Sequence, residues 1–130
     1  MKERKFLITI NRHVSEVFEF TINPINTAKW IDGIEKEETN EWPVKVNSIY
    51  RNIGTSGKWN EYTLTRFEEN KIFELTSKDG RYHVRYTYAP ITDNISTLEY
   101  FEWVDEGELS DLFSQSVLEK LKVILESDNK

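Results

Sequence analysis

The sequence predicts an α+β domain in which a seven-stranded antiparallel sheet curves around a long C-terminal helix, with two short helices between the first two strands. Three observations lead to this prediction. The length of 130 residues suits one domain, which we place at residues 1–130. Six β-rich segments follow one another between residues 33 and 104, joined mostly by short turns. The segment after residue 104 has apolar residues at helical spacing.

The N-terminal part of the chain combines a strand with a short helix. Residues 5–12, KFLITINR, are rich in β-forming side chains and predict the first strand. Val14, Val17 and Phe18 then fall at positions i, i+3 and i+4, which places them on one face of a helix.

A second short helix is expected over about residues 24–32. Asn23 is suited to cap its N-terminus, and Pro24 is favourable at the first helical position, where an N–H has no partner within the helix. Gly33 can adopt the left-handed conformation that ends a helix. Trp30 falls in the last turn, where we expect it to pack between the short helices and the sheet.

Strands dominate the middle of the chain. Asp79-Gly80 is a strong hairpin signal, because both residues tolerate a positive φ. The charged run EKEE at residues 35–38 is interpreted as the solvated face of a strand. The expected strands cover residues 33–40, 48–54, 58–67, 72–78, 81–89 and 95–104, and residues 90–94 are expected to form a turn.

The C-terminal segment predicts a helix of four or five turns. Asp105 and Glu108 have the spacing of a capping box at its start. Apolar residues recur at every fourth position, which gives the helix one face to bury against the sheet. These residues are Leu109, Phe113, Val117, Leu121 and Leu125.

Composition and charge exclude several classes of function. The net charge of −6, without a run of Lys or Arg, argues against nucleic-acid binding. No apolar run approaches the ~18 residues that span a bilayer, and the charged N-terminus is unlike a signal peptide, so we expect a cytoplasmic protein. The chain has no Cys, and His13 and His83 lack metal-ligand spacing. We expect neither a metal nor a cofactor.

The strand at residues 81–89 offers two faces. Tyr82, Val84, Tyr86 and Tyr88 share one of them, and His83, Arg85 and Thr87 share the other. We favour the tyrosine face as the inner one, because burying an Arg without a partner is costly. If the other face pointed inward, Arg85 and His83 would suit an anionic head group.

For the last strand, at residues 95–104, the residue types do not decide which face points inward. Either face carries one glutamate and aromatic residues, so one glutamate is expected to face the interior in both cases. A carboxyl there, or Glu61 on a neighbouring strand, would suit acid–base chemistry if burial raised its pKa. One face holds Thr97, Glu99, Phe101 and Trp103, and the other holds Leu98, Tyr100 and Glu102.

This order of elements resembles the helix-grip fold of the SRPBCC (START-like, birch-allergen-like) superfamily, in its bacterial polyketide cyclase/lipid-transport-like branch. The resemblance rests on VSEVFEFTINPINTAKWIDGIEKEE at residues 14–38, on the hairpin YTLTRFEENKIFEL at 62–75, and on VLEKLKVILE at 117–126. It covers about residues 4 to 126. Asn23 stands where that branch usually has Asp, and either residue can cap a helix.

The resemblance implies a single START-like ligand-binding domain with a cavity between the sheet and the long helix. Its occupant would be a lipid, a polyketide or another apolar small molecule, and a homodimer is left open. Because no catalytic constellation is recognisable, we favour a carrier; the alternatives are a polyketide cyclase/dehydratase-type enzyme and a protein-interaction module. The candidate ligand-binding residues are Trp30, Trp59, Tyr82, Tyr86, Tyr88, Glu99, Phe101, Trp103, Phe113 and Val117.

Overall fold

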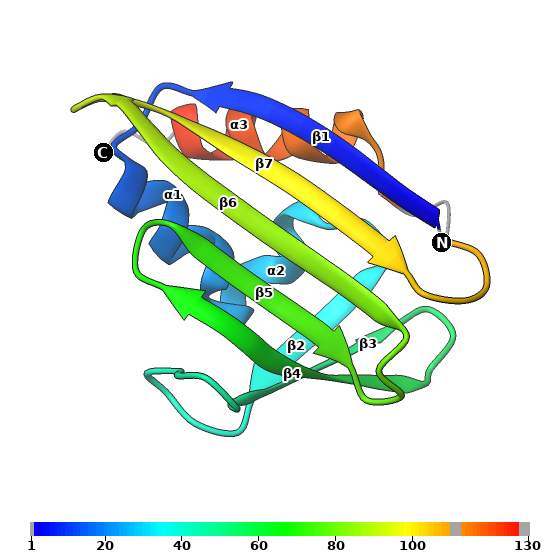
Figure 1. Ribbon diagram of the computed structural model, residues 1–130. Coiled ribbons are helices and arrows are strands. Elements are labelled where there is room, and N and C mark those ends of the chain that lie inside the picture. Colours follow the sequence, from blue (N-terminus) through cyan, green and yellow to red (C-terminus); the bar gives the residue numbers. More distant parts are fainter. Residues whose placement is uncertain (1, 110–112, 128–130) are drawn as a thin grey trace.

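The computed structural model confirms the α+β helix-grip fold, and it describes residues 2–109 and 113–127 (Figure 1). Seven strands form one antiparallel sheet in the order β1-β7-β6-β5-β4-β3-β2. The strands are β1 (Lys2–Ile10), β2 (Ile34–Thr39), β3 (Ile49–Gly54), β4 (Trp59–Glu68), β5 (Ile72–Ser77), β6 (Tyr82–Thr92) and β7 (Ile95–Val104). The helices are α1 (Val14–Ile22), α2 (Pro24–Trp30) and α3 (Gln115–Glu126).

The two short helices begin where their caps predict. The His13 side chain accepts a hydrogen bond from the backbone N–H of Ser15 at the start of α1. Asn23 does the same for the N–H of Ile25 at the start of α2, with Pro24 in the first turn. Gly33 has a φ of 91° and turns the chain from α2 into β2.

The helices lie on the concave side of the curved sheet (Figure 1). The C-terminal helix α3 packs against β1 and α2, whereas α2 also packs against β2 and α1 packs against β6 and β7. Inward-facing strand residues and the apolar faces of the helices form one core. Its most deeply buried apolar side chains are those of Ile10, Val17, Trp30, Tyr50, Leu64, Leu98, Leu118 and Leu121.

The start of the C-terminal helix differs from the prediction. It begins at Gln115, and Ser114 occupies the N-cap position, so the predicted capping box at Asp105 is wrong. The Asp105 carboxylate lies instead 3.1 Å from Nε2 of His83, and the backbone N–H of Asp105 donates to the carbonyl of Arg81. The part of the predicted helix at residues 110–112 lies outside the described residues.

Two strand boundaries also differ from the expected ones. Strand β1 covers residues 2–10 rather than 5–12. Strand β6 continues to Thr92 through the segment expected to turn, with an irregularity in its pairing between Pro90 and Thr92. An irregularity of this kind accommodates Pro, which has no N–H to donate to a neighbouring strand.

The side of α3 that faces the core should dominate the stability of the fold. Leu118 is 0% exposed, so Leu118→Ala removes buried apolar surface and leaves a cavity. We expect a loss of about 2–5 kcal/mol in the free energy of unfolding, measured by urea denaturation. Val123 on the same helix is 64% exposed, and Val123→Ala should change that free energy by less than about 1 kcal/mol. Equal losses for the two variants would contradict the assigned packing of α3.

Candidate functional site

A cavity of about 490 Å³ lies on the concave side of the sheet. Its walls come from strands β2 to β7, from α1 and α2, and from the segment that precedes α3. Among the described residues, α3 itself contributes no lining side chain, because it packs over β1 and α2. The cavity therefore lies beside the long helix, where the sheet curves away from it.

Aromatic and aliphatic side chains make up much of the cavity wall. The rings of Tyr100 and Phe113 stack in parallel with their centroids 3.6 Å apart. Trp30 meets the rings of Tyr86 and Phe113 edge-on from behind, with centroids about 6 Å away. These contacts fix the rings of the wall. Other apolar lining residues are Ile31, Ile34, Phe73, Leu75 and Val84.

The pairing of β6 with β7 decides which side chains face the cavity. Tyr86 lies directly opposite Tyr100, and Val84 lies opposite Glu102, so all four point to the same side of the sheet. Tyr82, Val84, Tyr86, Tyr100 and Glu102 all line the cavity. The predicted inward orientation of the tyrosine face of β6 is confirmed.

The inner face of β7, which the sequence left open, is the one with Leu98, Tyr100 and Glu102, so three of the candidate ligand-binding residues are wrong. Glu99, Phe101 and Trp103 lie on the opposite, outer side of the sheet, where Trp103 stacks on His83 with centroids 4.7 Å apart. The guanidinium of Arg85 also lies over the Trp103 ring, 5.2 Å from its centroid. The outer face therefore has its own aromatic cluster, which is why aromatic residues occur on both faces of the strand.

The remaining sequence-predicted residues divide between the cavity and the core. Phe113 lines the cavity, as do Tyr82 and Tyr86. Trp30, Tyr88 and Val117 are buried in the core and do not line it, and the hydroxyl groups of Tyr88 and Thr21 are hydrogen-bonded at 2.6 Å. Trp59 is partly exposed and packs beneath the guanidinium of Arg51, outside the cavity. Ligand contact by the three lining residues stays a prediction.

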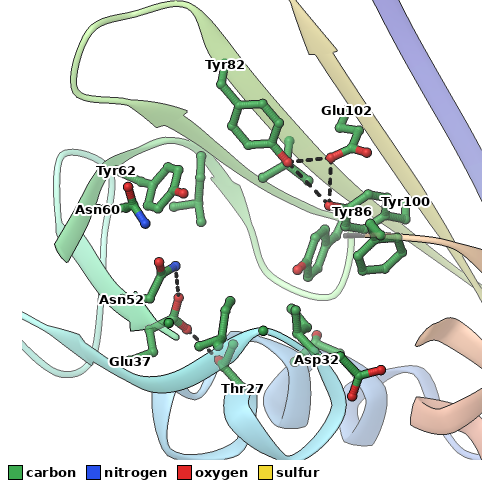
Figure 2. Close-up of a pocket in the computed structure, with 18 of the residues that line it drawn as sticks. Thr27, Asp32, Glu37, Asn52, Asn60, Tyr62, Tyr82, Tyr86, Tyr100 and Glu102 are labelled. Carbon is green, nitrogen blue, oxygen red and sulfur yellow. Dashed lines mark hydrogen bonds between the residues drawn. The ribbon is translucent and has the colours of Figure 1, made fainter. Parts of the chain in front are cut away.

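One end of the cavity is formed by a buried carboxylate that sequence reasoning did not select. Glu102 is 3% exposed, and its Oε1 accepts hydrogen bonds from the hydroxyls of Tyr82 at 2.5 Å and Tyr100 at 3.0 Å (Figure 2). Its Oε2 accepts from Nε of Arg4 on β1 at 2.7 Å. Burial, together with the negative charge of Glu102, raises the pKa of both phenols. They are therefore neutral donors toward the carboxylate.

A second carboxyl group enters the cavity from β2. The Thr27 hydroxyl donates to Oε1 of Glu37 at 2.5 Å, and the Asn52 amide donates to Oε2 at 3.2 Å (Figure 2). Burial raises the pKa of Glu37, and the two hydrogen bonds offset part of that effect. Burial and the nearby charge of Glu37 also raise the pKa of Tyr62.

The interpretation of residues 35–38 as a solvated face is therefore wrong for Glu37. A β-bulge explains the error. Ile34 pairs with Gly54 and Lys36 pairs with Ile53, so β2 has one extra residue between these two pairs. The extra residue changes the alternation of the strand, and both Ile34 and Glu37 line the cavity although they are three positions apart. Simple period-two alternation cannot reveal this arrangement.

The described part of the chain has neither a metal-binding cluster nor a membrane-spanning helix. Within it, no group of three or more His, Cys, Asp or Glu residues is arranged to hold a metal ion. No described helix is both long and apolar enough to cross a membrane.

No known family model and no curated protein matches the sequence. Solved structures do match the fold. A START superfamily protein from Mycobacterium smegmatis has a TM-score of 0.66 at 12% identity, with 96% of this chain and 94% of that one covered. The Zhui aromatase/cyclase from Streptomyces sp. R1128 has a TM-score of 0.65 at 14% identity, with 97% of this chain and 85% of that one covered. The Aha1 dimer from Colwellia psychrerythraea has a TM-score of 0.71 at 15% identity, with 97% of each chain covered. These similarities show the expected SRPBCC-type, START-like fold.

The raised pKa of Glu37 should make stability depend on pH in a defined direction. Between the ordinary value of 4.5 and the raised value, the folded state keeps a proton that the unfolded state has released. Stability from this group therefore falls as pH rises through that interval. Glu37→Gln, which remains neutral, should become increasingly stable relative to the unchanged protein as pH rises from 4.5 to the raised pKa, measured by urea denaturation over a series of pH values.

Glu35→Gln is the matched control, because Glu35 is an exposed carboxylate on the same strand. That change should alter the free energy of unfolding at neutral pH by less than about 0.5 kcal/mol. A stability difference between Glu37→Gln and the unchanged protein that stays constant with pH would refute the assigned burial of Glu37.

Proposed function

We propose that the protein binds a small, largely apolar molecule, with an aromatic or otherwise flat portion, in the cavity beside α3. The observation that carries this proposal is the cavity itself, at about 490 Å³ and walled by the rings of Phe73, Tyr86, Tyr100 and Phe113. Cavities that hold small molecules range over roughly 300–1,000 Å³ and combine apolar walls with a few polar groups.

Apolar and polar parts of the cavity wall would contribute to binding in different ways. Transfer of apolar ligand surface out of water contributes ~25 cal/mol per Å². The polar groups at the two ends of the cavity, Glu37 with Asn52 and Glu102 with Tyr82, supply orientation. A START superfamily protein and an aromatase/cyclase among the similar structures are consistent with a ligand-binding use of the fold.

A second candidate function is catalysis of the cyclase/dehydratase type. The observation that favours it is the pair of carboxyl groups, Glu37 and Glu102, in one cavity. Burial raises the pKa of Glu37, which is the direction that suits a carboxyl group for proton transfer. A cavity of this size would hold a reactive chain folded, so that the carbons that join lie close together. The protein-interaction alternative stays a prediction.

Binding should be detectable on the protein as it is purified. Native mass spectrometry should show one added small molecule, and denaturing extraction should release an apolar compound. If the molecule is lost during purification, a panel of lipids and aromatic compounds should contain a stabilising ligand. At about one hundred times its Kd, such a ligand raises the free energy of unfolding by about 2.7 kcal/mol.

Two variants on β6 make this test specific. Val84 faces the cavity, so Val84→Phe should fill it and abolish both the added mass and the stabilisation. Thr87 lies on the outer side of the same strand, opposite Glu99, and Thr87→Phe should keep both signals. A clean mass for the unchanged protein, together with no stabilisation by any compound of the panel, would count against the binding function.

The catalytic candidate has its own test. The protein is incubated with a linear poly-β-ketone thioester, and the products are separated by liquid chromatography and mass spectrometry. An enzyme of this type gives a cyclised product with the mass loss of one water, and Glu37→Gln should lower the rate by about 10²–10⁴-fold if Glu37 transfers the proton. Identical product formation with and without protein would reject the catalytic candidate for this substrate class.

A further inference from the structure

The charged residues that line the cavity all have the same sign. They are Asp32, Glu37, Glu102 and Glu108, and among the described residues no Lys, Arg or His lines the cavity. A cavity of this kind favours cations and disfavours anions by its electrostatic potential.

Three of these four carboxylates are already paired with a cation of the protein. Arg4 lies 2.6 Å from Glu102 deep in the wall. At the rim of the cavity, Lys120 lies 3.0 Å from Asp32, and Lys2 lies 3.6 Å from Glu108.

Glu37 is the exception within the described part of the chain. Among the residues that the structure describes, its two oxygens accept hydrogen bonds from the hydroxyl of Thr27 and the amide of Asn52, and both of these groups are neutral. A carboxylate held among neutral partners gains more from an incoming cation than one that already has a counter-ion, because the cation offsets the cost of its desolvation.

Aromatic rings and a free hydroxyl group line the same cavity as Glu37. Tyr62 and Tyr86 both belong to its wall, and burial, together with the charge of Glu37, raises the pKa of both hydroxyls. Tyr86 is 6% exposed, and in the described residues its hydroxyl has no hydrogen-bond partner. In Figure 2 this hydroxyl points into the space between Glu37 and the pair Tyr82–Glu102.

We infer that the ligand of this cavity is an amine, bound as its cation, with Glu37 as the counter-ion and the surrounding tyrosines as an aromatic cage. This inference rests on the proposed binding function and gives its ligand class. An ammonium group donates hydrogen bonds to the carboxylate and to the Tyr86 hydroxyl, and it is attracted to the faces of aromatic rings. Fatty acids and other anionic lipids are disfavoured by the same arrangement.

The test compares three probes that share an indole ring and differ in charge: ethylindole, tryptamine and indolepropionic acid. Their affinities are measured by isothermal titration calorimetry at neutral pH. We expect tryptamine to bind about tenfold more tightly than ethylindole, and the acid to bind about tenfold more weakly.

Substitutions in β2 test whether Glu37 causes the preference for tryptamine over ethylindole. Glu37→Gln should lower the affinity for tryptamine to that for ethylindole, while ethylindole binding stays within about twofold. Glu37→Asp keeps the charge and should retain part of the preference. Glu35→Gln removes an exposed carboxylate of the same strand and should retain all of it.

The outcomes separate the inference from the function on which it rests. If ethylindole binds and tryptamine has no advantage, or if the advantage survives Glu37→Gln, the amine inference is overturned and the binding function stands. If the acid binds best, the inference is likewise overturned. If none of the three probes binds and no other compound stabilises the protein, the binding function fails and the inference fails with it.

Discussion

The cavity depends on a mismatch between the concave face of the sheet and the helix that covers it. Helix α3 is 12 residues long and packs against β1 and α2, so it reaches only one side of the seven-stranded sheet. Protein interiors are otherwise close-packed, at a density of about 0.75, and a space of about 490 Å³ persists only where backbone elements hold the walls apart. Here the curvature of β3 to β6 provides those walls, and α2 with Phe113 narrows the space from the other side.

The partly buried pair Arg4–Glu102 is better explained by the geometry of the cavity than by stability. A buried ion pair often stabilises a fold no more than apolar residues of the same volume would. What this pair does is satisfy one carboxylate oxygen, so that the other accepts the hydroxyls of Tyr82 and Tyr100. Both phenols are thereby held in the cavity wall with defined proton positions. Strand β1 thus contributes to a site that none of its own residues lines.

Most of the fold was predictable because its signals are local. Turn residues separate the strands, Asn23-Pro24 marks the start of α2, and all seven strands were found with errors mainly at their ends. The site was less predictable, because its residues depend on non-local pairing. Glu102 is buried by virtue of Arg4, nearly a hundred residues away, and Glu37 turns inward because of a bulge. The spacing of apolar residues at every fourth position could not show that Phe113 lies before α3. In the structure this residue precedes the helix and forms part of the cavity wall.

Glutamates of this sheet show how environment, rather than residue type, sets the chemistry of the site. Glu99 lies on the outer face of β7, Glu102 on the inner face with a cation, and Glu37 on the inner face of β2 among neutral donors. Of the two that face the cavity, Glu37 is therefore the one that has no cation of the protein beside it among the described residues. Apolar walls accept many molecules of suitable size, because burial of apolar surface is not directional. If the cavity binds a ligand, selection among such molecules must therefore come from its few polar groups, and among the described carboxylates that line it Glu37 is the one without a cation of the protein beside it.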